Sequence, residues 1–244
     1  MAAINPTIQR WVQNAREAPE EFWAKAANDL PWFRKWDSVL EWDFPNFRWF
    51  SGSQTNLSYN CLDYHLNNGR GSHTALIYVN ERGEQSRFTY MELTVEVERI
   101  AASLRKLGIR KGDRITIYMP TNPEAIMTML AAVRIGAIHS VVFAGFGPGA
   151  LAERIRTTGS RLVFTADVSY RKGTVVKLKE IVDSALRTGG DTVEHVIVLQ
   201  RSDKGASVSG RDLGWEEFLE GGVGHDGSHV PMEANEPAYI LATS

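Results

Sequence analysis

The chain has almost no cysteine, no uninterrupted apolar run and almost no net charge, and each of these absences excludes a class of protein. Cys61 is the only cysteine in 244 residues, so a disulfide within the chain is excluded and a reducing, cytoplasmic location is expected. A formal net charge of −2 gives no electrostatic reason to expect nucleic acid or an anionic membrane as a partner. The most apolar window, residues 125–147, contains Arg134 and therefore predicts a protein core rather than a membrane span.

Residues 113–165 organise the rest of the chain, because β-branched runs alternate there with helical patterns. The predicted strands are residues 114–119, 139–143 and 161–165. A helix is expected to begin at the capping side chain of Asn122 and to bury one apolar stripe, Ile126, Met129, Leu130 and Val133. A second helix is expected to follow the glycine loop 145–149 and to end at Gly159.

This alternation with short joints predicts a parallel sheet in layers flanked by helices, an α/β fold. Ligands of such sheets bind at the carboxyl ends of the strands. The loops after Met119, Phe143 and Thr165 are therefore the predicted site region.

The same patterns continue on both sides of this stretch. Thr89 and Glu92 form a capping box before a helix that runs to Leu107, preceded by a predicted hairpin of residues 74–79 and 85–88. After Thr165 the sequence predicts a helix over residues 175–185, a strand over 195–199, a surface excursion over 201–231 with a helical patch at 215–219, and a strand over 238–244.

Residues 1–58 differ from the remainder, since six of the seven tryptophans lie between Trp11 and Trp49. No periodic pattern is present over residues 30–53. We therefore expect an irregular, aromatic-rich arm that wraps the main domain of residues 59–244. An independent small domain is the alternative.

Two loops at the predicted ligand edge are candidate sites. Gly145, Gly147 and Gly149, with Asp167 about twenty residues on, approach a dinucleotide fingerprint, but the glycine spacing departs from it and a plain tight turn is the alternative. Arg171 follows the third strand and suits an anion, although a solvated basic helix start explains it equally well. No metal site is expected, because His225 and His229 lack a third ligand nearby.

The sequence as a whole resembles the AMP-forming acyl-CoA synthetases of the adenylate-forming superfamily, and most closely the acetyl-CoA synthetases. The resemblance is carried by GDRITIYMPTNPEAIMTMLAAVRIGAIHSVVFAGFGPGAL in the central stretch, and by LSYNCLDYH, FTYME, SRLVFTAD and VEHVIVL around it. The aromatic arm resembles the N-terminal extension of that family. The match covers nearly the whole chain.

The resemblance implies an acid:CoA ligase that uses ATP, coenzyme A and Mg²⁺ to make an acyl-adenylate from a short carboxylic acid and then an acyl-CoA. It also implies that this chain is the N-terminal portion only, with an incomplete AMP-binding domain that stops at Thr243 and Ser244, the first residues of the ATP phosphate loop. No catalytic residue is expected within the chain. The fragment alone is therefore expected to be inactive, with the remainder of the polypeptide as its partner.

By the same resemblance, Phe143, Ala144 and Gly145 lie against the adenine of coenzyme A and Arg171 faces its 3′-phosphate. Ala144 stands where the family usually has a second glycine, and Thr174 where it usually has a second arginine. A non-catalytic module that binds coenzyme A or a nucleotide is the alternative function.

Overall fold

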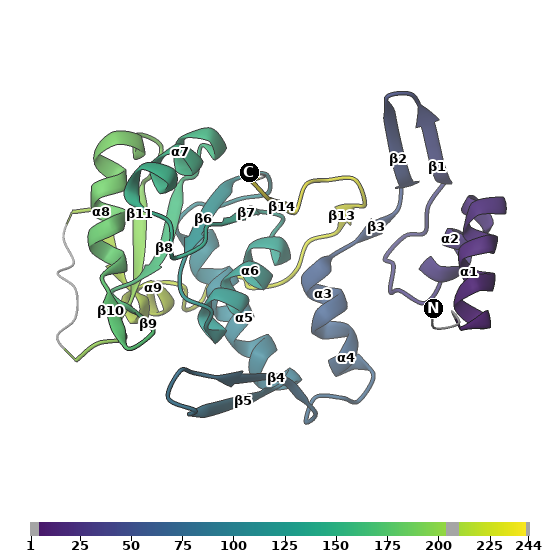
Figure 1. The fold of residues 1–244 in the computed structure, drawn as a ribbon. Coiled ribbons are helices and arrows are strands. Elements are labelled where there is room, and N and C mark those ends of the chain that lie inside the picture. Colours follow the sequence, from purple (N-terminus) through teal and green to yellow (C-terminus); the bar gives the residue numbers. More distant parts are fainter. Residues whose placement is uncertain (1–4, 204–209, 243–244) are drawn as a thin grey trace. The chain divides into compact units, whose positions relative to one another are not determined.

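The computed structural model describes residues 5–203 and 210–242 and divides the chain into two compact units, each considered by itself (Figure 1). The smaller unit comprises Met1–Asn56 together with Pro231–Glu236. The larger comprises Leu57–Val230 together with Pro237–Ser244.

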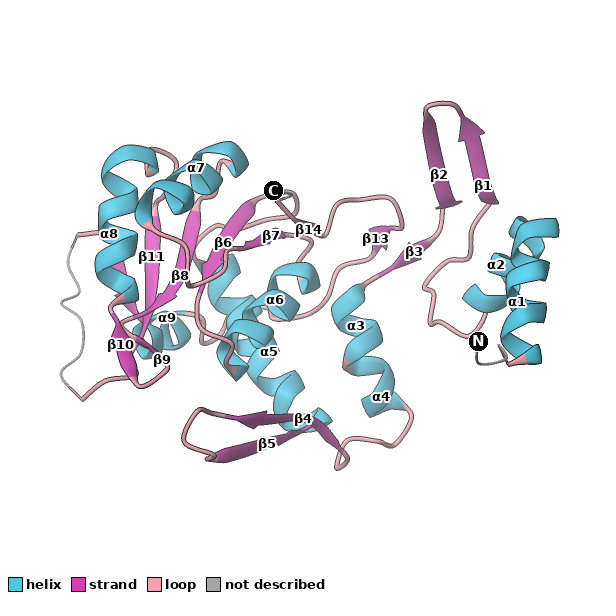
Figure 2. Ribbon diagram, in the orientation of Figure 1, coloured by secondary structure: helices cyan, strands magenta, loops and turns pink. Residues whose placement is uncertain are grey.

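The larger unit is built on a six-stranded sheet whose paired strands are all parallel, which confirms the predicted α/β fold (Figure 2). Its strands, in spatial order, are β12 (Asp212–Gly214), β11 (His195–Leu199), β8 (Leu162–Ala166), β6 (Arg114–Tyr118), β7 (Ile138–Val141) and β14 (Tyr239–Ile240). Because neighbours run the same way, as in the pairing of Ile117 with Phe164, all carboxyl ends meet at one edge of the sheet.

Helices cover both faces of this sheet. The helices α5 (Tyr90–Lys106), α6 (Pro123–Arg134) and α9 (Trp215–Gly221) share a buried apolar cluster with Ile117 and Phe164. The helices α7 (Pro148–Thr158) and α8 (Leu178–Gly189) share the opposite cluster with Tyr118 and Val163. The alternation of side chains along β6 and β8 therefore supplies two separate cores.

The helix starts follow the local signals of the sequence. In α5 the Thr89 hydroxyl accepts a hydrogen bond from the Glu92 amide at 3.2 Å, and the Glu92 carboxylate accepts one from the Thr89 amide at 2.8 Å. In α6 the Asn122 side chain accepts from the Ala125 amide at 3.2 Å. Both caps confirm the predicted helix starts.

The buried face of α6 differs from the predicted stripe. Of the four predicted residues only Val133 is fully buried, while Ile126, Met129 and Leu130 are partly exposed. The fully buried positions are mostly small: Ala125, Met127, Thr128, Ala131 and Ala132. The buried face of this helix therefore combines small residues with Met127, Val133 and Arg134 rather than following the predicted stripe.

The segment after β8 also corrects the prediction, because Val175 belongs to a strand and not to a helix. The strands β9 (Ser169–Arg171) and β10 (Thr174–Val176) form an antiparallel hairpin, and α8 begins only at Leu178. Lys172 and Gly173 make its turn with φ of 49° and 75°, the left-handed pair that a tight hairpin turn requires.

Residues 201–231 are not only a surface excursion. β12 pairs in parallel with β11, and α9 buries Trp215, Phe218 and Leu219. Two of these rings pack edge-on to Phe164. The segment therefore completes one face of the sheet.

The remaining elements of the larger unit precede α5. They are α3 (Leu57–Cys61), α4 (Asp63–Asn67) and the antiparallel hairpin of β4 (Thr74–Val79) with β5 (Gln85–Thr89), which confirms the predicted hairpin. Among the helices in the described part of the chain, none has the length and apolar character that a membrane crossing needs.

The smaller unit contains more regular structure than its sequence indicated. It comprises α1 (Pro6–Glu17), α2 (Pro19–Ala27), the hairpin of β1 (Ser38–Asp43) with β2 (Asn46–Ser51), and the short pair β3 (Gln54–Thr55) with β13 (Met232–Glu233). Trp32, Trp36 and Phe50 pack together, with ring centroids 5.0–5.6 Å apart. The expectation of no periodic structure over residues 30–53 is therefore wrong, and the wrapping of the main domain stays a prediction.

Candidate functional site

The turn that follows β7 presents two aromatic rings at the carboxyl edge of the sheet. Val142 is still buried, and its amide donates to the Ile117 carbonyl at 2.9 Å. Phe143 and Phe146 then lie 59% and 39% exposed, with ring centroids 5.7 Å apart in an edge-to-face arrangement. Rings this exposed at a ligand edge are available to stack on a ligand.

Arg171, at the end of β9, reaches the same turn. Its guanidinium carbon lies 5.6 Å from the centre of the Phe143 ring. A Cβ on Gly145 would collide with that ring and lie 3.0 Å from Nη1 of Arg171. The structure therefore brings Phe143, Gly145 and Arg171 together, and the close approach requires glycine at position 145.

Ala144, the fourth residue singled out by the sequence, contributes its backbone to the same place. Its carbonyl lies 3.4 Å from the hydroxyl of Tyr118, which also donates to the Phe146 carbonyl at 2.6 Å. Tyr118 is fully buried, and burial raises the pKa of its phenol. Tyr118 was not expected from the sequence; its signal was a phenol near the carboxyl end of a buried strand.

Further guanidinium groups pack on aromatic rings, one of them in this turn and one on β9. The guanidinium carbon of Arg154 lies 4.6 Å from the centre of the Phe146 ring, and those of Arg82 and Arg201 each lie 5.5 Å from the centre of the Tyr170 ring. Aromatic faces beside guanidinium groups suit a ligand that combines a planar ring with anionic groups.

Asp167 has a structural role, so the dinucleotide interpretation is wrong. Its carboxylate is 3% exposed and accepts hydrogen bonds from the amides of Arg201 and Ser202 at 2.8 and 3.0 Å and from the Ser202 hydroxyl at 2.6 Å. These bonds tie the end of β8 to the end of β11. No ribose could reach a carboxylate that is buried and fully engaged.

The remaining candidate sites from the sequence were the start of the phosphate loop and the histidines of residues 225–229. Thr243 and Ser244 lie outside the described residues. Within the described ranges, no group of three or more His, Cys, Asp or Glu side chains is arranged to hold a metal ion. His229 instead lies 3.5 Å from the Asp63 carboxylate.

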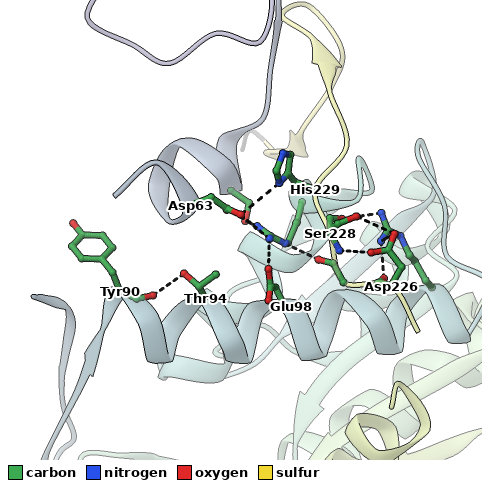
Figure 3. Close-up of polar contacts among 11 residues, drawn as sticks. Asp63, Tyr90, Thr94, Glu98, Asp226, Ser228 and His229 are labelled. Carbon is green, nitrogen blue, oxygen red and sulfur yellow. Dashed lines mark hydrogen bonds and ion pairs between the residues drawn. The ribbon is translucent and has the colours of Figure 1, made fainter. Parts of the chain in front are cut away.

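At the opposite edge of the sheet, a buried arginine holds four segments together. Arg134 is 1% exposed; its guanidinium donates to Asp63 at 2.7 and 2.9 Å, to Glu98 at 2.6 Å and to the Gly227 carbonyl at 2.7 Å. Figure 3 shows Asp63 and Glu98 converging from different helices, with His229 beside Asp63. Burial alone would raise the pKa of Asp63, but the hydrogen bonds and charge of Arg134 hold that pKa below its ordinary value.

A parallel sheet with aromatic and guanidinium groups at its carboxyl edge defines the class: an α/β protein whose candidate ligand site lies where ligands of such sheets bind. Comparison with known families is more specific. Residues 64–244 match the AMP-binding enzyme family, and residues 8–61 match the acetyl-coenzyme A synthetase N-terminus. The chain belongs to the AMP-binding enzyme family, which confirms the resemblance found in its sequence.

The relatives agree with this assignment. The acetyl-coenzyme A synthetase of Deinococcus radiodurans is 41% identical over 97% of this chain, and the 3-hydroxypropionyl-coenzyme A synthetase of Metallosphaera sedula is 44% identical over 94%. The structure of acetoacetyl-CoA synthetase from Streptomyces lividans matches 94% of this chain with a TM-score of 0.82 and 25% identity. The chain spans only 36%, 35% and 35% of the lengths of these three proteins.

Proposed function

We propose that the chain is the N-terminal segment of an ATP-dependent acid:CoA ligase. Such an enzyme joins a short carboxylic acid to coenzyme A, with AMP and pyrophosphate as products of an acyl-adenylate route. The family assignment and the names of the relatives support this proposal, since three different acyl-CoA synthetases align with nearly the whole chain. The cytoplasm is the compartment we propose.

The chain's own contribution is part of the coenzyme A site. The observation that carries this is the contact of Arg171 with the Phe143 ring across Gly145. In the proposed complex the Phe143–Ala144–Gly145 turn packs on the adenine, and the Arg171 guanidinium pairs with the 3′-phosphate. Arg171 stands on a hairpin, and the helix expected to begin near Val175 begins only at Leu178.

ATP and Mg²⁺ belong to the proposed reaction, but we assign them no ligands among the described residues. The proposed phosphate loop begins at Thr243 and Ser244, outside those residues. The proposed substrates are small molecules rather than nucleic acid or membrane.

The test uses the complete gene product that carries this chain. Arg171→Ala should raise the KM for coenzyme A by about tenfold, as expected for the loss of one charge-assisted hydrogen bond, and leave ATP–pyrophosphate exchange nearly unchanged. With dephospho-CoA, which lacks the 3′-phosphate, the same variant should behave like the wild type. Arg156→Ala, which removes an exposed arginine on α7, is the matched control.

Two results would contradict the proposal. Equal losses with coenzyme A and dephospho-CoA would show that Arg171 does not read the 3′-phosphate. Absence of acid-dependent pyrophosphate exchange in the complete wild-type product would favour the alternative, a non-catalytic module that binds coenzyme A or a nucleotide.

A further inference from the structure

The aromatic turn of residues 143–147 has little backbone bonding of its own. Inside it, the Phe146 amide donates to the Phe143 carbonyl at 2.9 Å. At its end, Gly147 is the N-cap residue of α7; its carbonyl accepts from the Leu151 amide at 3.2 Å, but it has no side chain to cap the helix. A turn with so few bonds needs support from elsewhere to hold two half-exposed rings in place.

Tyr118 supplies that support from below. It is the last residue of β6, in the centre of the sheet, and its ring is fully buried in the cluster shared with α7. A ring fixed on all sides keeps its hydroxyl in one place. That hydroxyl lies 2.6 Å from the Phe146 carbonyl and 3.4 Å from the Ala144 carbonyl, on either side of Gly145.

The direction of this hydrogen bond is constant over the working range of pH. Burial raises the pKa of the phenol above its ordinary value of 10.0, so the hydroxyl stays protonated and donates. Two backbone carbonyls can only accept. The phenol is therefore a fixed donor to a turn that carries the proposed coenzyme contacts.

We propose that Tyr118 is a positioning residue for the acceptor substrate: its hydroxyl holds the 143–147 turn so that the Phe143 ring and Arg171 meet coenzyme A in one arrangement. The inference rests on the proposed function for its substrate. Tyr118 itself touches no ligand and acts through the carbonyls of Phe146 and Ala144.

Tyr118→Phe removes only the hydroxyl and keeps the buried ring. In the complete enzyme it should raise the KM for coenzyme A by about 3- to 10-fold, the worth of one hydrogen bond, while kcat and ATP–pyrophosphate exchange change by less than about twofold. Tyr78→Phe, a half-buried tyrosine on β4, is the matched control and should change nothing.

A double-mutant cycle separates positioning from general loosening. If Tyr118 acts through the Phe143–Arg171 contact, Tyr118→Phe should add less than about a twofold rise in KM once Arg171 is already alanine. Equal effects of Tyr118→Phe in both backgrounds would overturn the proposal.

Two further measurements guard against a variant that simply folds poorly. In this chain, hydrogen exchange at the Phe146 amide should quicken in Tyr118→Phe while exchange in the α5 core stays unchanged. Gly147 has φ of −78° and open space for a side chain, so Gly147→Ser adds a helix cap. Combined with Tyr118→Phe, it should lower the raised KM for coenzyme A part of the way back to the wild-type value.

The outcomes also separate this inference from the proposed function. If Arg171→Ala raises the KM for coenzyme A but Tyr118→Phe leaves both KM and Phe146 exchange unchanged, the positioning role is refuted and the coenzyme site stands. If Arg171→Ala has no effect on coenzyme A, both are refuted.

Discussion

The two edges of the central sheet use arginine in opposite ways. At the amino edge, Arg161 binds Asp113 at 2.7 Å and Glu194 at 2.8 and 2.9 Å, and Arg114 donates to the carbonyls of Thr158 and Gly159. At the carboxyl edge, Arg154 and Arg171 lie over aromatic rings. Among the ion pairs of the described ranges, none includes either of these two arginines.

This difference distinguishes arginines that stabilise the fold from arginines that are available to a ligand. A guanidinium whose donors are already bound to carboxylates and carbonyls stabilises the protein. One that lies on a ring keeps most of its donors for a ligand. The comparison predicts that substitutions at the amino edge cost stability, whereas substitutions at the carboxyl edge cost binding.

The largest expected effect is at Arg134, on the amino-edge side. Arg134→Ala removes a buried guanidinium and leaves the partly buried Asp63 carboxylate with only His229 beside it among the described residues, so the free energy of unfolding should fall by about 3 kcal/mol. Urea denaturation of this chain measures it. Arg99→Ala, which breaks a largely exposed pair with Glu96, is the control and should cost less than about 1 kcal/mol. If Arg134→Ala and Arg99→Ala lowered the free energy of unfolding by similarly small amounts, the stabilising role of the amino-edge arginine would be contradicted.

The next effect concerns His139, near the start of β7. Burial lowers the pKa of its imidazole from 6.5 to about 4. Between those pH values the unfolded chain binds a proton that the folded chain does not, so stability should fall as the pH drops from 6.5 towards 4, by on the order of 2–3 kcal/mol. His139→Phe should flatten this part of the pH profile, measured by urea titration at several pH values. Replacement of the exposed His73 by Phe should leave the profile as it is.

A direct test compares one arginine from each edge. Arg161→Ala should lower the free energy of unfolding by about 1–3 kcal/mol, and Arg171→Ala should change it by less than about 0.5 kcal/mol. The Arg161 hydrogen bond lowers the pKa of Glu194, so the stability from this pair is present above the ordinary pKa of 4.5 and is lost as the pH falls below it. The gap between wild type and Arg161→Ala should therefore narrow in acid. Equal destabilisation by Arg161→Ala and Arg171→Ala would contradict the contrast between the two edges of the sheet.

A small effect on stability is also expected at Gly145. In Gly145→Ala the new Cβ displaces the exposed Phe143 ring, which can swing into solvent, so unfolding should change by less than about 1 kcal/mol. The proposed coenzyme A affinity should nevertheless fall by about tenfold, measured as KM in the complete enzyme. Gly149→Ala, where a Cβ meets open space, is the control. An unchanged KM for coenzyme A in Gly145→Ala would show that the coenzyme A site does not include this turn.

The features that the sequence predicted are those with local signals. The capping box of Thr89 and Glu92, the Asn122 cap and the apolar runs of β6, β8 and β11 all depend on residues a few positions apart. The meeting of Phe143 with Arg171 was expected only through family resemblance. No local pattern links residues on two different loops.

The features that it did not predict depend on distant partners or on small residues. Arg134 pairs with Asp63, 71 residues away, so no spacing rule could identify the pair. The inward face of α6 includes Thr128 and Arg134 as well as alanines, which its own apolar pattern does not encode. The hydroxyl of Tyr118 acquires its role from carbonyls 26 and 28 residues further on.

The hairpin that carries Arg171 also limits how this locus can evolve. Its turn is only Lys172 and Gly173, with Arg171 paired directly with Thr174. Because side chains alternate along a strand, inserting one residue between Val168 and Arg171 would rotate the guanidinium to the ribbon's other side, where Tyr170 now points. Homologous genes should therefore vary in length at the tip of this hairpin and not along β9, so an alignment gap inside β9 would mark a lineage that has abandoned the contact with Phe143.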